Sequence, residues 1–322
     1  MDCCFDGDVF VLRDYNREPP FSGLLPGVAG LRGVPLWCFY VSRGQGVASC
    51  GAGERDGAMM EYVPAVTAYE DTARKGFRTF ISCGGRCFEP FAPDDPAQKQ
   101  ELRVSRAALE LRALHEPSDI EVRVEYRILP GEDMGALMRR VTVRNTGGGS
   151  ITFRLADGMA RVIPAGIRNR EFLEMANLLK SYFDARLDGS GAALFSSRTT
   201  TENTARVGSV RRKNFYFASS GGRAMKLVCD PVRLFGPDTA LGRPARFYEA
   251  GFDMGGAPSD ARDGIPCAMA LGEFSLAPGG EAVIDAFAGS ADSAEQAALY
   301  THKFTDKAWC DGKHALSEQV VL

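Results

Sequence analysis

The sequence has little histidine, no concentrated basic face and no long apolar run. Three of the 322 residues are histidine, and 38 basic residues against 41 acidic ones give a formal net charge of −3. Nucleic-acid binding needs clustered positive charge, so this balance argues against a nucleic-acid partner. No stretch approaches the ~20 apolar residues that cross a membrane. The start, MDCCFDGDVF, lacks the basic and apolar regions of a signal peptide, so we expect no membrane partner either.

The nine cysteines follow neither a disulfide nor a zinc pattern. Their number is odd, and four of them lie inside strand-like runs: Cys38, Cys50, Cys229 and Cys267. Scattered thiols of this kind are typical of reduced cysteines, so we expect a cytoplasmic location. Cys83 and Cys87 stand four residues apart with no second Cys/His pair nearby. A structural zinc ion needs four ligands, so the sequence predicts no metal.

Other catalytic patterns are also weak. The glycines at 44–46 and 51–53 resemble a nucleotide loop, but strand-like sequence follows them where a dinucleotide loop would open a helix. No Gly-x-Ser-x-Gly elbow occurs. The paired acids Asp94-Asp95, Glu132-Asp133 and Asp260/Asp263 lie in Pro- or Gly-rich turns, where carboxylates bond their own backbone. We interpret them as solvated and assign no catalytic residue.

Period-two alternation indicates many strands. Ile120 to Ile128 alternates apolar with charged residues, which is typical of a half-buried strand. Met269–Leu276 and Ala282–Ala288 flank Ala277-Pro278-Gly279-Gly280, which predicts a hairpin. Further strands are expected at Val9–Leu12, Leu36–Val41, Ala58–Tyr62, Phe77–Ser82, Leu102–Leu111, Leu137–Asn145, Ser150–Leu155, Phe215–Ala218 and Met225–Val228. So many strands with few helices between them predict a mainly β protein, a large antiparallel β-sandwich.

Two helices and one basic loop interrupt the strands. Arg170 to Phe183 has helical spacing with Asn169 as its expected cap. Ser293 to Lys313 predicts a long C-terminal helix with no obvious partner in this chain. The short basic run Arg206–Lys213 is expected to be a solvated loop. We therefore expect a β-sandwich domain over residues 1–290 and the start of a helical linker over residues 291–322.

One cluster has the chemistry of a sugar-handling surface. Aromatic rings pack against the C–H faces of sugars, and arginine or glutamine donates hydrogen bonds to hydroxyl groups. The candidate substrate or interdomain surface consists of Trp37, Tyr40, Arg43 and Gln45. The alternative is that Trp37, Phe39 and Val41 form the inward face of one strand. The sequence leaves both interpretations open.

The same region resembles a known family. The pieces FSGLLPGVAG, GVPLWCFYVSRGQGVASCG, DGAMMEYVPA and GFRTF run in order from Phe21 to Phe80. They resemble the N-terminal region of bacterial inverting glycoside phosphorylases of the cellobiose phosphorylase group, formerly glycosyltransferase family 36 and now glycoside hydrolase family 94-like, with the 1,2-β-oligoglucan phosphorylases as the nearest likeness. DGIPCAMALGEFSLAPGGEAVIDAFAG is similar to the family's closing hairpin. The resemblance covers Tyr15 to Gly289.

The resemblance implies a galactose-mutarotase-like β super-sandwich, followed by a helical linker and a catalytic (α/α)6 barrel. The family's general acid and phosphate-binding residues lie in that barrel, outside these 322 residues, so no catalytic residue carries over. The implied reaction is reversible phosphorolysis of β-glucosides or β-glucans to α-glucose 1-phosphate, with inorganic phosphate as co-substrate and no metal or organic cofactor. The sandwich would pack on the barrel and form a homodimer.

Three hypotheses follow. The chain is a non-catalytic domain of such a phosphorylase, inactive alone; this is the interpretation we favour. Alternatively, it is a free-standing carbohydrate-binding β-sandwich that binds oligosaccharides by itself. A small complete enzyme would need a cleft with perturbed carboxylates, and the turn placement of the acids argues against it.

Overall fold

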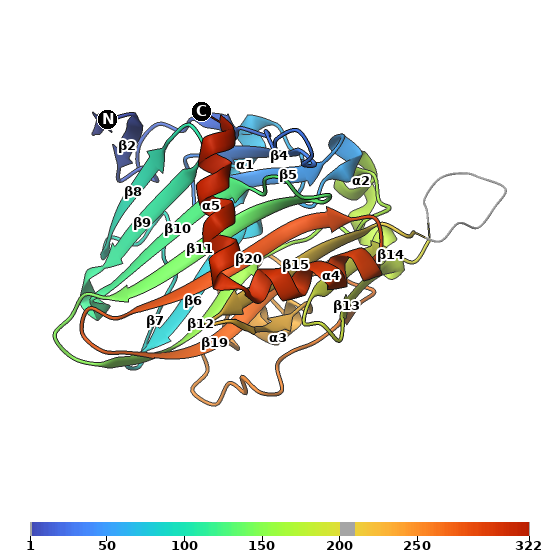
Figure 1. Cartoon of the computed structure of the whole chain (residues 1–322). Helices are drawn as coiled ribbons and strands as arrows, with labels where there is room; N and C mark the ends of the chain where they lie inside the picture. Colours follow the sequence, from blue (N-terminus) through green and yellow to red (C-terminus); the bar gives the residue numbers. More distant parts are fainter. Residues whose placement is uncertain (1, 200–209, 322) are drawn as a thin grey trace.

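The protein is built from antiparallel sheets, as the strand pattern predicts. The computed structural model describes residues 2–199 and 210–321. Within them the strands form one sheet of 12 strands, one of 5 and one of 3. The two larger sheets face each other and enclose the main core (Figure 1). The prediction of a mainly β, antiparallel sandwich is confirmed.

The strands of the large sheet, in spatial order, are β1 (Cys3–Asp6), β2 (Val9–Arg13), β8 (Gln98–Val104), β9 (Leu109–His115), β10 (Ile120–Ile128), β11 (Gly135–Asn145), β20 (Glu281–Ala291), β15 (Lys213–Ser220), β14 (Ala193–Ser197), β13 (Phe183–Leu187) and β18 (Ala261–Arg262), with β16 (Arg223–Ala224) paired to β15. The second sheet consists of β17 (Lys226–Val228), β19 (Ala268–Leu276), β12 (Ile151–Met159), β6 (Phe77–Cys83) and β7 (Arg86–Phe88). The third consists of β3 (Ser22–Leu25), β4 (Leu36–Val41) and β5 (Val47–Ala52).

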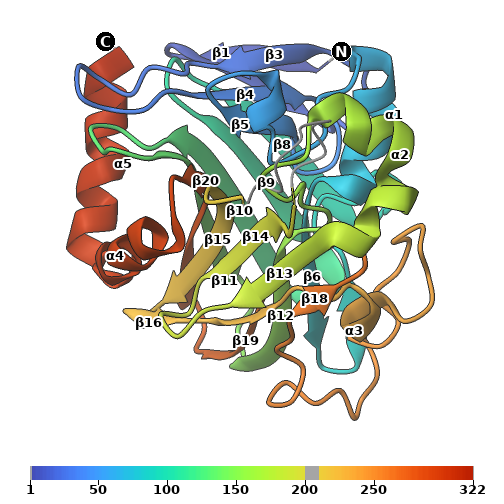
Figure 2. The ribbon, with the colours of Figure 1, turned by 90° about the vertical axis from the view of Figure 1, so that its right-hand side faces the viewer.

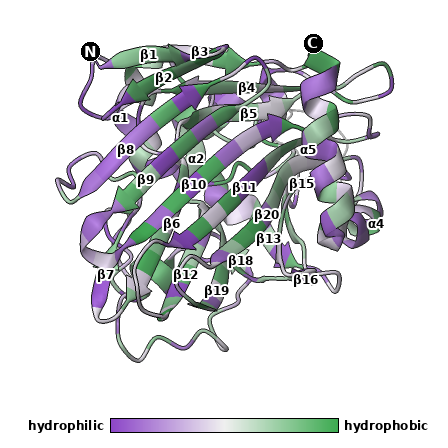
Figure 3. Cartoon of the chain, turned by 60° about the vertical axis from the view of Figure 1, so that its left-hand side comes forward, coloured by the Kyte–Doolittle hydropathy of each residue, from purple (hydrophilic) through white to green (hydrophobic). Residues whose placement is uncertain are grey.

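Alternation along the strands sets the two faces of the large sheet. In β10 the apolar side chains from Ile120 to Ile128 are buried, while the charged residues between them point outward. The same purple and green alternation is visible along β8 to β11 (Figure 3). The outer face of these strands is therefore charged, and the inner face supplies the core.

Two connections cross between the sheets, and one of them corrects a prediction. The turn 277–280 was expected to close a hairpin, but β19 belongs to the second sheet and β20 to the large one. β11 and β12 are divided in the same way, so β20 pairs with β11 while β19 pairs with β12. Asn145 holds both turns, because its side-chain nitrogen donates to the carbonyls of Gly149 and Leu276 at 2.7 and 3.3 Å.

Two strand boundaries also differ from the prediction. Ala58–Tyr62 forms no strand; it follows the short 3-10 helix η1 (Arg55–Gly57) and makes a single bridge to β5. The expected strand Leu102–Leu111 is instead the end of β8 and the start of β9, separated by a turn. Residues 206–209 of the basic run 206–213 lie outside the described residues. In the described half, Arg212 donates to the Ser290 hydroxyl at 2.7 Å and Lys213 donates to the Ser196 hydroxyl at 2.8 Å, so these two side chains are bound and not free in solvent.

The helices lie on two opposite sides of the sandwich (Figure 2). The helices are α1 (Ala65–Lys75), α2 (Asn169–Leu179), α3 (Val232–Phe235), α4 (Ala294–Thr305) and α5 (Lys307–Val321), with further 3-10 turns η2 (Glu116–Ser118) and η3 (Lys180–Tyr182). Helix α1 was not predicted from the sequence, because many of its residues, AVTAYEDTARK, are polar. Within the described residues no helix is long and apolar enough to span a bilayer.

The C-terminal helix is broken and has a partner, contrary to the prediction. Ser293 caps α4, because its hydroxyl accepts from the Gln296 N–H at 3.3 Å. Asp306 ends that helix and begins the next, accepting from two N–H groups of α5. Phe304 stacks on Phe287 of β20 at 3.9 Å between ring centroids. The helix pair therefore buries its apolar side against the outer face of the large sheet.

Candidate functional site

The cluster around Trp37 lies on a strand that is covered on both faces. Leu36, Cys38 and Tyr40 face the main core, opposite in parity to the inward face that the sequence suggested. Trp37 packs instead against a second apolar cluster that contains Phe172 of α2. A strand with neighbours on both faces gives no alternation from which its inward face can be predicted.

Tyr40 and Arg43 are held by the protein itself. Tyr40 is 7% exposed, and its ring meets Phe21 edge-on at 6.4 Å. The guanidinium of Arg43 donates to the backbone carbonyls of Tyr15, Ser42 and Glu18 at 2.7 to 3.0 Å. Burial lowers the pKa of Arg43. These contacts fix the turn between β4 and β5.

Gln45 belongs to a polar network in the centre of the sandwich. Its amide nitrogen donates to Thr79 at 2.8 Å, and its amide oxygen accepts from Arg139 at 2.5 Å. Arg139 also pairs with both oxygens of Asp157, which comes from the opposing sheet. Arg139 is 1% exposed and Asp157 is fully buried. The network ties the two large sheets and the β4–β5 turn together, away from solvent.

Next to Trp37 lies an exposed aromatic residue, Tyr62, that was not among the candidate residues predicted from the sequence. The indole N–H of Trp37 donates to the Glu54 carbonyl at 3.2 Å, and its ring meets Tyr62 edge-on at 5.6 Å. Tyr62 is 44% exposed. The guanidinium carbon of Arg55 lies 5.4 Å from the centroid of the Tyr62 ring. We call Trp37, Arg55 and Tyr62 the aromatic platform.

A polar cleft adjoins the platform. Its volume is about 490 Å³, and it runs between η1 and the first turn of α2. Three arginines and four carboxylates line it: Arg55, Arg168, Arg170, Glu54, Asp56, Glu171 and Glu174. We call this the arginine cleft.

Asn169 joins the cleft to the platform, and its role differs from the predicted helix cap. Arg168 precedes α2 as its N-terminal cap residue, and Glu171 accepts from the Arg168 N–H at 3.3 Å. The Asn169 side chain instead accepts from the backbone N–H of Tyr62 at 2.8 Å and donates to its carbonyl at 3.1 Å. Its own N–H donates to Asp56 at 3.0 Å. The fully buried Asn169 therefore fixes the backbone beneath Tyr62.

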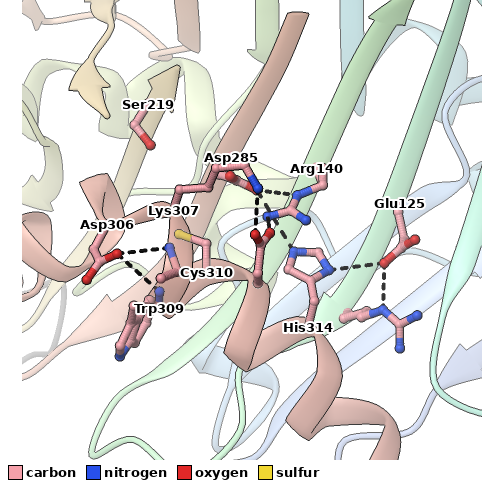
Figure 4. Close-up of polar contacts among 12 residues, drawn as sticks. Glu125, Arg140, Ser219, Asp285, Asp306, Lys307, Trp309, Cys310 and His314 are labelled. Atoms are coloured by element: carbon pink, nitrogen blue, oxygen red, sulfur yellow. Dashed lines mark hydrogen bonds and ion pairs between the residues drawn. The ribbon is translucent and has the colours of Figure 1, made fainter. Parts of the chain in front are cut away.

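A second polar cluster, beneath α5, has residue types that could serve in catalysis (Figure 4). His314 Nδ1 lies 3.1 Å from Glu125, and its Nε2 lies 4.0 Å from Asp285. Arg140 pairs with Asp285 at 2.6 Å and with Asp311 at 2.8 Å. Each ion pair joins α5 to the sheet or one strand of the sheet to the next. The cluster therefore fastens the helix.

Glu125 shows the electrostatic consequence of this arrangement. Burial would raise its pKa, but His314 and Arg127 outweigh burial and lower the pKa to about 2. A carboxyl group with so low a pKa stays ionised at neutral pH and cannot donate a proton.

Glu132 corrects the expectation of a solvated turn acid, whereas its neighbour Asp133 is exposed as expected. Glu132 pairs with Lys313 at 2.6 Å and with Lys303 at 3.0 Å, and it accepts from the Tyr300 hydroxyl at 2.8 Å. Burial opposes ionisation of Glu132, but these donors together lower its pKa. The turn between β10 and β11 is thereby bound to both C-terminal helices.

Glu89 has a partly buried carboxyl group, with 20% of its side chain exposed, and resembles the kind of group a general acid needs. Burial raises its pKa, and the guanidinium of Arg78 only partly offsets that effect. Both of its oxygens accept from Arg78, each at 2.6 Å. Arg78 is 3% exposed and also donates to the Gly242 carbonyl at 3.0 Å. Both carboxylate oxygens of Glu89 are therefore occupied by Arg78, which also binds the loop that contains Gly242.

Acidic residues also line a second cleft of about 490 Å³, beside α3. Asp238 there accepts from the N–H groups of Ala240 and Gly242, and these bonds lower its pKa. Asp263 pairs with Arg198. Over residues 2–199 and 210–321, no three His, Cys, Asp or Glu side chains are grouped so as to hold a metal ion.

Comparisons with known proteins leave the family open. No family model and no curated protein matches the chain. A polysaccharide lyase is 11% identical at a TM-score of 0.40, covering 86% of this chain and 33% of that one. A bacterial glucoamylase complexed with acarbose is 12% identical at a TM-score of 0.47, and the match covers 95% of this chain and 38% of that one. A candidate kojibiose phosphorylase from the human microbiome is 6% identical at a TM-score of 0.39, and the match covers 94% of this chain and 30% of that one.

This chain thus spans about a third of the length of those solved structures. At such low identities and TM-scores, the likeness supports no assignment of activity.

Proposed function

We propose that the chain is a non-catalytic β-sandwich domain of a carbohydrate-active inverting glycoside phosphorylase. The proposal combines the resemblance of Phe21–Phe80 with one structural observation. Glu89, a partly buried carboxyl group whose pKa is raised, has both oxygens bound by Arg78. A general acid must have its proton free to transfer to the leaving oxygen. The acid for glycosidic cleavage would therefore come from outside this domain.

The parent enzyme would cleave β-glucosides or β-glucans with inorganic phosphate to give α-glucose 1-phosphate. A phosphate oxygen forms the new bond to the anomeric carbon while an acid protonates the departing glycosidic oxygen. That geometry inverts the anomeric centre and needs no oxidant, metal or organic cofactor. The barrel that carries this chemistry would pack against the sandwich, and the sandwich would take part in a homodimer.

A cytoplasmic location is part of the proposal. All nine cysteines are unpaired, and five of them are buried. Buried, unpaired thiols suit a reducing compartment, where disulfides do not persist.

The second candidate function is a free-standing carbohydrate-binding module. The aromatic platform favours it, because an exposed tyrosine held beside polar donors can bind a sugar without any catalytic group. This candidate predicts oligosaccharide binding by the isolated chain and no turnover in any longer polypeptide.

The test is phosphate release from α-glucose 1-phosphate with glucose or β-glucan as acceptor. It compares this chain alone with the chain joined to the polypeptide encoded downstream in the same reading frame. Activity in the longer protein alone supports the accessory domain. Activity in the 322-residue chain contradicts the proposal, and inactivity of both supports the binding module.

A further inference from the structure

We propose that the aromatic platform and the arginine cleft form one binding site for a β-linked gluco-oligosaccharide. The choice of ligand class depends on the proposed carbohydrate-related function. The site itself depends on the arrangement of Trp37, Arg55, Tyr62 and the cleft residues.

Tyr62 presents an exposed aromatic ring in a fixed position. The side chain of Tyr62 is 44% exposed, although its backbone N–H and its carbonyl are both hydrogen-bonded to the side chain of Asn169. Trp37 meets its ring edge-on, and Trp37 is itself fixed by the bond to the Glu54 carbonyl. A rigid aromatic ring loses little conformational entropy on binding, so it can stack on a sugar ring at low cost.

Polar groups that can bind hydroxyl groups lie directly beside this ring. Arg55 lies over Tyr62 and also lines the cleft, so the aromatic ring and the cleft share a wall. The cleft volume of about 490 Å³ lies within the range of small-ligand sites, roughly 300–1,000 Å³. The planar guanidinium fork can donate to two adjacent hydroxyl groups, and carboxylates can accept from them.

The charge of the cleft suits a neutral ligand. Three guanidinium groups face four carboxylates, so the site is nearly neutral overall. Arg170 pairs with Glu174 at 2.8 Å, and Asp56 accepts from the Asn169 N–H. A polyanion would need an excess of positive charge, which is lacking. Alternating donors and acceptors suit a neutral ligand with many hydroxyl groups.

A matched control residue lies nearby in the sequence. Tyr182, in η3, is also 44% exposed. It does not line the arginine cleft, and within the described residues its ring contacts no other aromatic ring and no cationic group. Replacing Tyr182 removes an equal exposed tyrosine and leaves the platform intact.

The test is equilibrium titration of the intact chain with gluco-tetrasaccharides that are β-1,2-, β-1,3- or β-1,4-linked, using an α-1,4-linked tetrasaccharide for comparison. We expect the wild type to bind at least one β-linked ligand. Tyr62→Ala should weaken binding about tenfold, and Arg55→Ala should weaken it by a similar factor. Tyr62→Phe keeps the ring and should bind within about twofold of wild type, as should Tyr182→Ala. Urea unfolding of each variant checks that the surface changes leave the fold intact.

Three results would overturn the site. They are binding that survives Tyr62→Ala unchanged, an equal loss in Tyr182→Ala, and no binding of any tetrasaccharide by the wild type. If a protein partner protects Tyr62 while the sugars do not bind, the surface is a protein interface and the proposal is wrong. The phosphate-release assay is independent of Tyr62, so it separates failure of this site from failure of the proposed function.

Discussion

Replacing Arg139 with methionine should destabilise the whole sandwich while leaving the surface unchanged. The guanidinium lies 1% exposed between the sheets and supplies the donors for Asp157, Gln45 and Tyr126. Without it, the fully buried Asp157 keeps one hydrogen bond, from the Thr79 hydroxyl at 2.6 Å.

Breaking a buried ion pair in this way costs about 3–5 kcal/mol, because a charge is left buried without its partner. The free energy of unfolding of a domain is about 5–15 kcal/mol, so Arg139→Met should remove a large part of it. The double variant Arg139→Met/Asp157→Leu also removes the orphaned charge. It should be more stable than the single variant by at least about 1–2 kcal/mol.

Urea unfolding, followed by circular dichroism, measures the three free energies of unfolding under the same conditions. Arg144→Met serves as the control, because Arg144 of the same strand pairs with Glu281 at 3.8 Å, both side chains are about half exposed, and exposed pairs contribute about 1 kcal/mol or less. If Arg139→Met costs less than about 1 kcal/mol, or if the double variant is the least stable, the buried pair does not hold the sheets together as described.

Three further predictions concern other contacts. Asn145→Ala should cost about 2 kcal/mol in urea unfolding, because the carbonyls of Gly149 and of the buried Leu276 in the crossing turns lose their donor. The low pKa of Glu125, about 2 in the folded protein against about 4.3 unfolded, gives a stabilisation that is present above pH ~4.3 and lost as the pH falls toward 2. Fluorescence of Trp309 on α5 should therefore change across that interval, and Glu125→Gln should weaken the change. In native protein a thiol reagent should label the exposed Cys3 and Cys4 first, and labelling of the five buried cysteines should require unfolding, since burial raises the pKa of Cys50 to about 12. Rapid labelling of more than four thiols would contradict the burial.

The strands were predictable wherever one face meets water. β10 has the limits that alternation predicts, because charge and apolarity mark its two faces. β4 also has its predicted limits, but its inward face was not predictable. Trp37 packs under α2 while Cys38 faces the main core, so both faces are apolar.

The sequence could not show which strands pair across a turn. The turn 277–280 has the residues of a hairpin, yet its strands belong to different sheets. The residues of the turn are compatible both with a hairpin inside one sheet and with a connection between two sheets. Which of the two forms depends on where the faces of both strands are buried. The same limit applies to Tyr62, which the pattern placed in a strand. Its position depends on Asn169, 107 residues further along the chain.

The measurement that tests the central claim most directly is a crystal structure of this chain with a β-linked gluco-tetrasaccharide. The account predicts a sugar ring stacked on Tyr62, with hydroxyl groups within hydrogen-bond distance of Arg55 or Arg170. A saccharide bound elsewhere, for example in the cleft beside Asp238, would contradict it.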